Sequence, residues 1–173
     1  MKSEQVENLF NHMMWADAEV WEKVLRLPAA ENDERIKKLL YHLHQVQYAY
    51  FFLCEEHPPK IPKQEEFTNL KSIALWGREY QEKMNLFLTS VKAEEKEKII
   101  EIPWAKLLER KIGKKVVAAT LEETMLQVAL HSTYHRGQIN TRLRELGGEP
   151  AIVDFIVWVW LGKPHANWGD VLN

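Results

Sequence analysis

Hydrophobic residues recur at steps of three and four over four long segments, which is the pattern of amphipathic helices. The pattern predicts helices over about residues 3–27, 33–56, 66–93 and 121–146. A shorter helix is predicted within the apolar stretch 152–162. Each long segment is long enough to present one continuous apolar stripe to a core, and together they predict an all-α protein.

Helix-breaking residues separate these segments. The three prolines of "HPPKIP" (57–62) cannot lie inside a helix, so the second helix has to end before them. Thr120 followed by Glu123 is a capping-box pair, in which each side chain accepts a hydrogen bond from the other residue's backbone N–H. The glycines at 147 and 148 are suited to a left-handed helix end. Thr68 and either Asn32 or Asp33 are candidate caps for the other helices.

Residues 94–118 have a different character from the helical segments. Two short β-prone runs, "IIEIPW" and "KVVAAT", lie on either side of Gly113, so a small hairpin or irregular excursion is expected here. With this long connection between helices three and four, the chain predicts an antiparallel four-helix bundle with a short C-terminal helix. We expect residues 1–173 to form a single domain and the tail from 163 onward to be irregular.

Composition and charge exclude several functions. The chain of 173 residues has a formal net charge of −2, which provides no general field for a nucleic acid backbone. The most apolar stretch covers about a dozen residues and contains Asp154, whereas a helix that spans a membrane needs about 20. Cys54 is the only cysteine. With no apolar leader at the N-terminus, we expect a cytoplasmic protein without a nucleic-acid or membrane partner.

The stretch "HSTYHRGQ" (131–138) carries the candidate chemistry. His131 and His135 are four residues apart, so their rings lie one turn apart on the same face of the predicted helix. At about 100° per residue, both lie at the edge of that helix's apolar stripe, where two imidazoles could reach one metal ion. Gln127 and Gln138 are on the same flank and could orient them. The alternative is a pair of rim histidines that bind carbonyls or water.

A metal site in a bundle needs a further ligand from a facing helix, and the helix predicted over residues 33–56 contains two candidate histidines. His42 and His44 each lie about 100° from the centre of their helix's apolar stripe, on opposite sides. Helical periodicity therefore does not choose between them.

Several motifs together resemble the DinB-like family of four-helix metalloproteins. The segment 131–138 is similar to the family's His-x-x-x-His-Arg-Gly-Gln helix, and "LRELG" with Pro150 and Asp154 follows in the family's order. "WAD" (15–17) resembles an element of its first helix. "LLYHLHQVQ" (39–47) resembles its second helix, in which Leu-Leu-x-His is followed five residues later by Gln or Glu.

The resemblance implies one divalent metal ion, often zinc or nickel, bound by His42, His131 and His135. Gln47 then takes the Gln/Glu position of the second helix, and His44 remains the rival ligand. The resemblance also implies a homodimer.

Three imidazoles leave a divalent ion with positive charge and open positions, as in catalytic rather than structural zinc sites. The first hypothesis is therefore an enzyme that activates a low-molecular-weight thiol for transfer to a small-molecule substrate, since relatives of this fold use such thiols. The second is a metal-dependent hydrolase with a metal-bound hydroxide. The third is a metal-binding dimeric stress or binding protein without catalysis.

Other residues have structural interpretations. Cys54 lies on an apolar stripe and is expected in the core. Arg136 is expected to form an ion pair between helices, and Gly137 to allow a close helix approach. Asp154 could cap the last helix or bind a histidine or Arg136.

Overall fold

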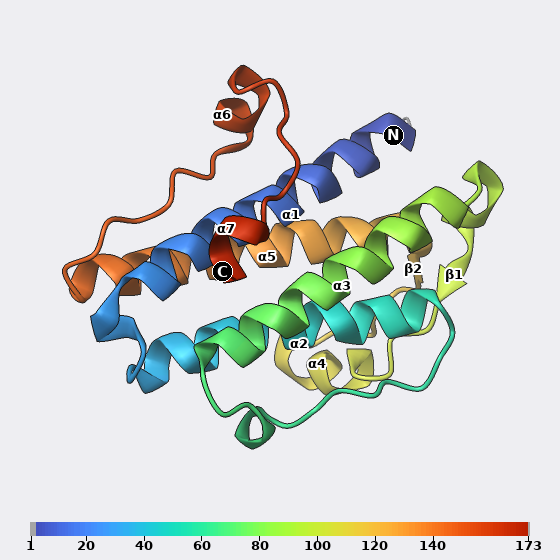
Figure 1. Ribbon diagram of the computed structural model, residues 1–173. Coiled ribbons are helices and arrows are strands. Elements are labelled where there is room, and N and C mark those ends of the chain that lie inside the picture. Colours follow the sequence, from blue (N-terminus) through green and yellow to red (C-terminus); the bar gives the residue numbers. More distant parts are fainter. Residues whose placement is uncertain (1–2, 173) are drawn as a thin grey trace.

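The computed structural model describes residues 3–172, and four long helices dominate it (Figure 1). These are α1 (Ser3–Arg26), α2 (Glu34–Cys54), α3 (Leu70–Ser90) and α5 (Leu121–Glu145). The all-α bundle expected from the sequence is confirmed. Each helix buries one apolar stripe, and the core contains large side chains from all four.

The long helices do not alternate in direction throughout. In Figure 1, α1 and α5 run one way and α2 and α3 run the other, so α2 and α3 are parallel neighbours. The connection 55–69 makes this possible, because its 15 residues can extend to roughly 50 Å, whereas α3 is about 30 Å long. This crossing segment is held to α2 by the Tyr41 hydroxyl, which donates to the carbonyl of Pro62 at 2.8 Å.

Helix ends follow the capping chemistry of the sequence. Asp33 caps α2 by accepting from the backbone N–H of Ile36, and Thr120 forms the expected capping box with Glu123 at the start of α5. The cap of α3 is Asn69 rather than Thr68, so this helix begins at Leu70, four residues later than expected.

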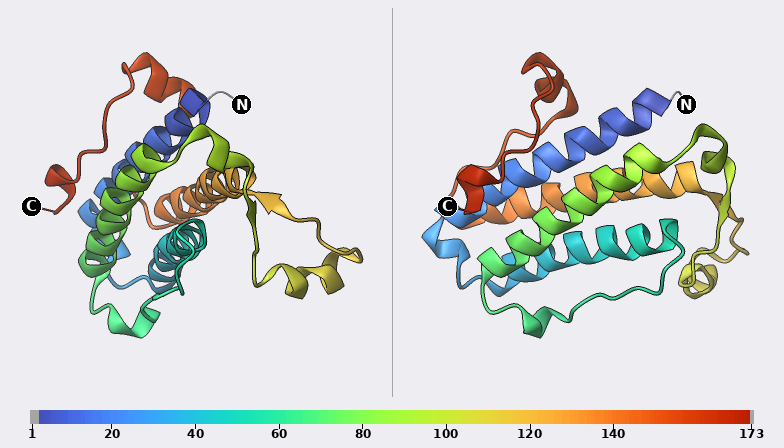
Figure 2. Two further views of the ribbon diagram at one scale, coloured as in Figure 1. Left: turned by 90° about the vertical axis from the view of Figure 1, so that its right-hand side faces the viewer. Right: turned by 45° about the vertical axis from the view of Figure 1, so that its right-hand side comes forward.

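The connection between α3 and α5 contains the expected hairpin and an unexpected helix. Strands β1 (Ile99–Ile100) and β2 (Ala119–Thr120) pair antiparallel, with Ile99 opposite Thr120. Between them lies α4 (Ala105–Ile112), which ends at Gly113 in the left-handed conformation. Figure 2 shows α4 standing away from the bundle on the side of α2 and α5.

The C-terminal region returns along α1. The predicted short helix is α6 (Phe155–Trp160), whose Trp158 is buried against Trp15 and Ala16 of α1. A further short helix, α7 (Gly169–Leu172), lies where an irregular tail was expected. Trp168, the residue before it, donates a hydrogen bond to the side chain of Gln81, and this contact anchors the tail on α3.

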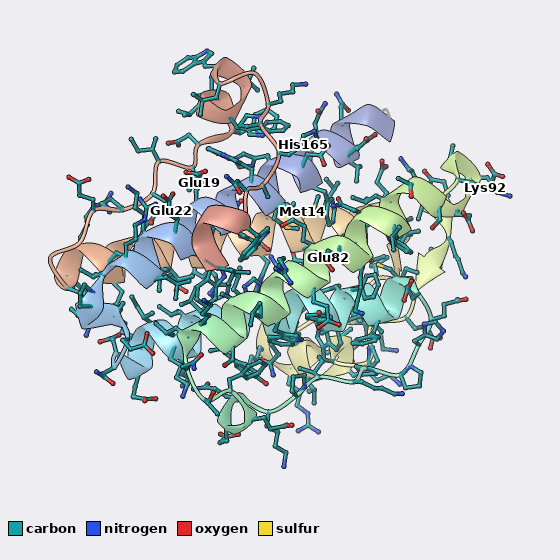
Figure 3. The ribbon with its side chains drawn as sticks, viewed as in Figure 1. Met14, Glu19, Glu22, Glu82, Lys92 and His165 are labelled. Atoms are coloured by element: carbon teal, nitrogen blue, oxygen red, sulfur yellow. The ribbon has the colours of Figure 1, made fainter. Side chains whose placement is uncertain are left out.

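Burial is arranged as a bundle requires: Met14 of α1 is buried, while Glu82 of α3 and Lys92 just beyond its end are exposed (Figure 3). Within the described residues, none of the helices combines the length and apolar character needed to cross a membrane.

Candidate metal centre

Three histidines from two helices meet where α2 and α5 pack together. His42 of α2 faces His131 and His135 of α5, and potential ligand atoms of the three rings all lie within 4.8 Å of one another. The ring centroid of His42 is 4.7 Å from that of His135 and 5.5 Å from that of His131. This group could hold a divalent metal ion.

The two α5 histidines are spaced as ligands of one ion. Their Nε2 atoms are 3.1 Å apart. If each stood 2.0–2.1 Å from a common ion, as zinc–imidazole bonds do, they would subtend about 95–102° there. That angle lies between the ideal values of octahedral and tetrahedral coordination. The Nδ1 atoms of both rings are buried without a hydrogen-bond partner.

The environment of the pair favours neutral imidazoles, which are the form that binds metals. Burial, followed by the proximity of the His135 and His42 rings, lowers the pKa of His131 to about 4. Burial, followed by the proximity of His42, also lowers the pKa of His135, against a smaller opposite effect of a hydrogen bond with Gln138. Of the two flanking glutamines singled out from the sequence, Gln138 thus contacts a histidine, while Gln127 is exposed.

The group is accessible from one side. His42 and His131 are partly exposed, whereas His135 retains 8% of its accessible surface. Tyr134, which is largely exposed, stands edge-on to the ring of His135 with centroids 5.1 Å apart. A small molecule could therefore approach the histidines from the surface beside Tyr134.

His44, the rival ligand, lies on the other side of α2 and is 1% exposed. The Trp21 indole donates to His44 Nε2 at 2.8 Å, so this nitrogen carries a lone pair. His44 Nδ1 therefore carries the proton and donates to Gln47 Oε1 at 2.7 Å. Gly77 of α3 packs against the same ring, and a Cβ at position 77 would overlap it. Both ring nitrogens are thus committed to hydrogen bonds within the core.

The hydrogen bonds continue from His44 across the bundle. Because Gln47 Oε1 accepts from His44, its amide nitrogen is the donor, and it reaches Asp17 Oδ2 at 2.7 Å and Ser132 Oγ at 3.1 Å. The other Asp17 oxygen pairs with Arg136 Nη1 at 2.7 Å, and both side chains are almost completely buried. Trp21, His44, Gln47, Asp17, Ser132 and Arg136 form what we call the buried chain.

The buried chain lies directly behind the histidine group. Ser132 and Arg136 follow His131 and His135 in the sequence, so the two sets occupy neighbouring faces of α5. Asp17 and Trp21 bring α1 into the chain, and Gln47 brings in α2. The chain therefore ties together the helix that carries His42 and the helix that carries the other two histidines.

The remaining candidates have structural roles. Arg136 forms the ion pair expected from the sequence, with Asp17 as its partner. Burial raises the pKa of Cys54 to about 12, which is not the environment of a reactive thiol. Asp154 precedes α6 but makes no capping hydrogen bond. The expectation for Gly137 was wrong: it is exposed, and nothing lies within 4 Å of a Cβ placed there.

The other histidines do not join the group. His57 and His165 are exposed, the latter on the C-terminal tail (Figure 3). His12 is buried beside α6, where its Nε2 donates to the carbonyl of Val153 at 2.8 Å.

Sequence comparison places the chain in a family. No curated protein gave a match. The model of the DinB family matches residues 1–165, which include all four bundle helices and all of the histidines described above. With this match over nearly its whole length, the chain belongs to the DinB family.

Proposed function

We propose that this protein binds one divalent metal ion, zinc or nickel, through His42, His131 and His135. The observation that carries the proposal is the convergence of these three imidazoles at an accessible point between α2 and α5. The lowered pKa values of His131 and His135 support it, because protons then compete less for their nitrogens. His44 is not proposed as a ligand, since Trp21 and Gln47 occupy both of its ring nitrogens.

We further propose that the site activates a low-molecular-weight thiol for transfer to an electrophilic small molecule. A bound ion of this type would favour the thiolate form of a thiol ligand near neutral pH. The three-histidine group contains no carboxylate, and none influences the pKa of His131 or His135. A thiol that the bound ion has already converted to a thiolate needs no separate general base, whereas hydrolysis usually benefits from a base that activates the attacking water.

The chain's own residues would supply position and access. Three neutral ligands leave the charge of the ion uncompensated, which favours an anionic ligand such as a thiolate. Tyr134 and Leu130 are exposed next to the histidines and provide apolar surface for the substrate.

Metal analysis tests the site itself. The protein is purified without a chelating tag, and its metal content is measured beside His42→Ala, His135→Ala and His44→Ala. We expect loss of the ion in the first two variants. His44→Ala is the control for removing a nearby imidazole, and we expect it to retain metal wherever it remains folded by circular dichroism. Full retention of metal in His135→Ala would disprove the site. Loss of metal in His44→Ala with retention in His42→Ala would show that His44, not His42, is the ligand from α2.

Activity assays test the reaction. We expect consumption of an electrophile such as monochlorobimane to require an added thiol, to stop after chelation and to return with zinc or nickel. Turnover of esters or amides without thiol would instead support the metal-dependent hydrolase. Inactivity of the fully metallated protein in both assays would support a non-catalytic metal-binding protein.

The proposal includes a single domain and a homodimer. Trp160 of α6 is 74% exposed, and Ile156 on the same short helix is also exposed, which supports a self-association surface there. Sedimentation equilibrium of the wild type and Trp160→Ser tests this part, because only an interface residue should change the apparent mass.

A further inference from the structure

The segment 101–118, which we call the wing, projects from the bundle (Figure 2). It carries both cationic and apolar side chains. It comprises α4 and the residues on either side of it. Lys106, Arg110, Lys111, Lys114 and Lys115 outnumber its two carboxylates, those of Glu101 and Glu109, so the wing has a net charge of +3 in a chain of net charge −2. No ion pair joins these five cations to a carboxylate within the part of the chain that the structure describes.

The apolar residues of the wing face solvent. None of the eight residues of α4 is buried, although the helix is strongly amphipathic. Leu107 is 73% exposed and Val117 91% exposed, and Leu108 and Ile112 are also exposed. Such exposure is unusual for a run of aliphatic side chains on one small element and indicates contact with another surface.

Cations border Leu107 on the outward side of α4. At about 100° per residue, Leu107 lies between Arg110 and Lys111 around the helix axis. Glu109 faces the other way, where its carboxylate accepts a hydrogen bond from the backbone N–H of Val116 at 3.1 Å. The inward carboxylate leaves the outward side positively charged.

A groove between the wing and strands β1 and β2 extends this apolar surface. It has a volume of about 440 Å³, and none of the three histidines of the candidate metal site lines it. Its walls are mainly aliphatic and come from both arms of the wing, including Ile102, Pro103, Val116 and Val117. Lys106 stands at the same groove, so a cation adjoins the apolar walls.

We propose that the wing is a peripheral docking surface for an anionic lipid bilayer. A projecting element with exposed aliphatic tips and a surrounding set of lysines and arginines suits the boundary between headgroups and acyl chains. The cations would bind the negative headgroups, and Leu107, Leu108 and Val117 would enter the interface. Sequence analysis predicted no membrane partner because it found no stretch long enough to span a bilayer, but interfacial contact does not require one.

The separation of charged and apolar groups on α4 favours a bilayer over an acidic protein. Helices that lie in a membrane interface carry a cationic face and an apolar face, and α4 places Leu107, Leu108 and Ile112 on one side and Lys106 and Arg110 on the other. Lysine, which is depleted in protein interfaces, supplies four of the five cations of the wing. The proposal is independent of the metal site.

Vesicle co-sedimentation of the full chain tests the proposal. We expect binding to vesicles of phosphatidylserine with phosphatidylcholine, weaker binding as salt rises, and no binding to phosphatidylcholine alone. Each cation near such a surface contributes roughly a fivefold increase in partitioning, so Lys114→Glu with Lys115→Glu should reduce binding at least about 25-fold. The matched control, Lys60→Glu with Lys63→Glu, makes the same charge change at exposed positions of the crossing segment 55–69 and should retain binding.

Insertion of apolar side chains into the bilayer is tested separately from the attraction between charges. Leu107→Ser with Leu108→Ser should weaken binding while leaving the circular dichroism spectrum unchanged, since neither side chain packs in the core. Equal loss in the control pair, or no binding to anionic vesicles, would overturn the proposal. So would binding only to acidic proteins, or a loss of self-association in the leucine variant without any vesicle binding.

Discussion

The side-chain amide of Gln47 donates a hydrogen bond to the carboxylate of Asp17 at 2.7 Å, joining α2 to α1 directly behind the three histidines. The same amide nitrogen reaches Ser132, and its oxygen accepts from His44. One glutamine thus satisfies polar groups on three helices.

Replacing Gln47 by Leu should therefore be strongly destabilising. Asp17, Ser132 and the His44 Nδ1–H would each lose a buried partner, at about 1–3 kcal/mol for a group left unsatisfied. We expect the free energy of unfolding to fall by about 2–4 kcal/mol in urea denaturation of the metal-free protein. Gln127→Leu on the exposed surface of α5 is the matched control and should change it by less than about 0.5 kcal/mol. Equal losses of unfolding free energy in the two variants would mean that the hydrogen bonds of Gln47 contribute nothing measurable to stability.

The ion pair of Asp17 and Arg136 predicts a non-additive pair of mutations. Both side chains are nearly inaccessible, so removing one leaves an uncompensated charge in the core. Asp17→Asn and Arg136→Met should each cost about 3–5 kcal/mol, and the double variant less than the sum of the two. A double-mutant cycle from denaturant unfolding measures the coupling. Additive losses would show that the two side chains stabilise the bundle independently.

The pKa of His131 predicts a pH dependence for the metal-free protein. Its folded value of about 4 lies below the unfolded value of about 6.5, so the unfolded state holds the extra proton between these limits. Stability is then complete above about pH 6.5 and is lost as the pH falls toward 4. The lowered pKa values of His135 and His44 act in the same direction.

Urea midpoints from pH 7 to pH 4 measure this effect. In His131→Gln the slope should be smaller than in the wild type. A pH slope that is identical in wild type and His131→Gln would contradict the prediction. Because metal binding requires unprotonated imidazoles, the loss on acidification should be steeper when zinc is present.

Two helical glycines should respond oppositely to alanine. A Cβ at position 77 would overlap the ring of His44, which cannot move without breaking its bonds to Trp21 and Gln47. A Cβ at position 137 would meet open space. We expect Gly77→Ala to destabilise the fold and Gly137→Ala to stabilise it by up to about 1 kcal/mol, the gain in helix propensity. Thermal unfolding of the two variants provides the comparison, and a stabilised Gly77→Ala would contradict the packing described.

The sequence predicted those parts of the fold that depend on a strong apolar stripe or on local hydrogen bonds. The long helices and the Thr120–Glu123 capping box belong to this class. Helix α4 was missed although its polar and apolar residues lie on different sides, because it has only eight residues and lies between two β-prone runs. The parallel direction of α2 and α3 was also missed, since the prolines of 57–62 end a helix without specifying where the chain goes next.

The metal candidates were partly predictable for a similar reason. Spacing and phase brought His131 and His135 together, but they treated His42 and His44 alike. The difference between these two depends on distant residues, since Trp21 is 23 positions from His44 and Gly77 lies on another helix. The partner of Arg136 is 119 positions away, and no local pattern points to it.

Each α5 histidine of the group is followed by a member of the buried chain, and this pairing has a consequence for how the site can change. Ser132 and Arg136 fix the rotation of α5 about its own axis, and the directions of the His131 and His135 rings follow from that rotation. A substitution deep inside the bundle can therefore re-aim both imidazoles without altering a histidine. At the proposed metal site, the preference for one ion over another would then be adjustable from positions that never touch the ion.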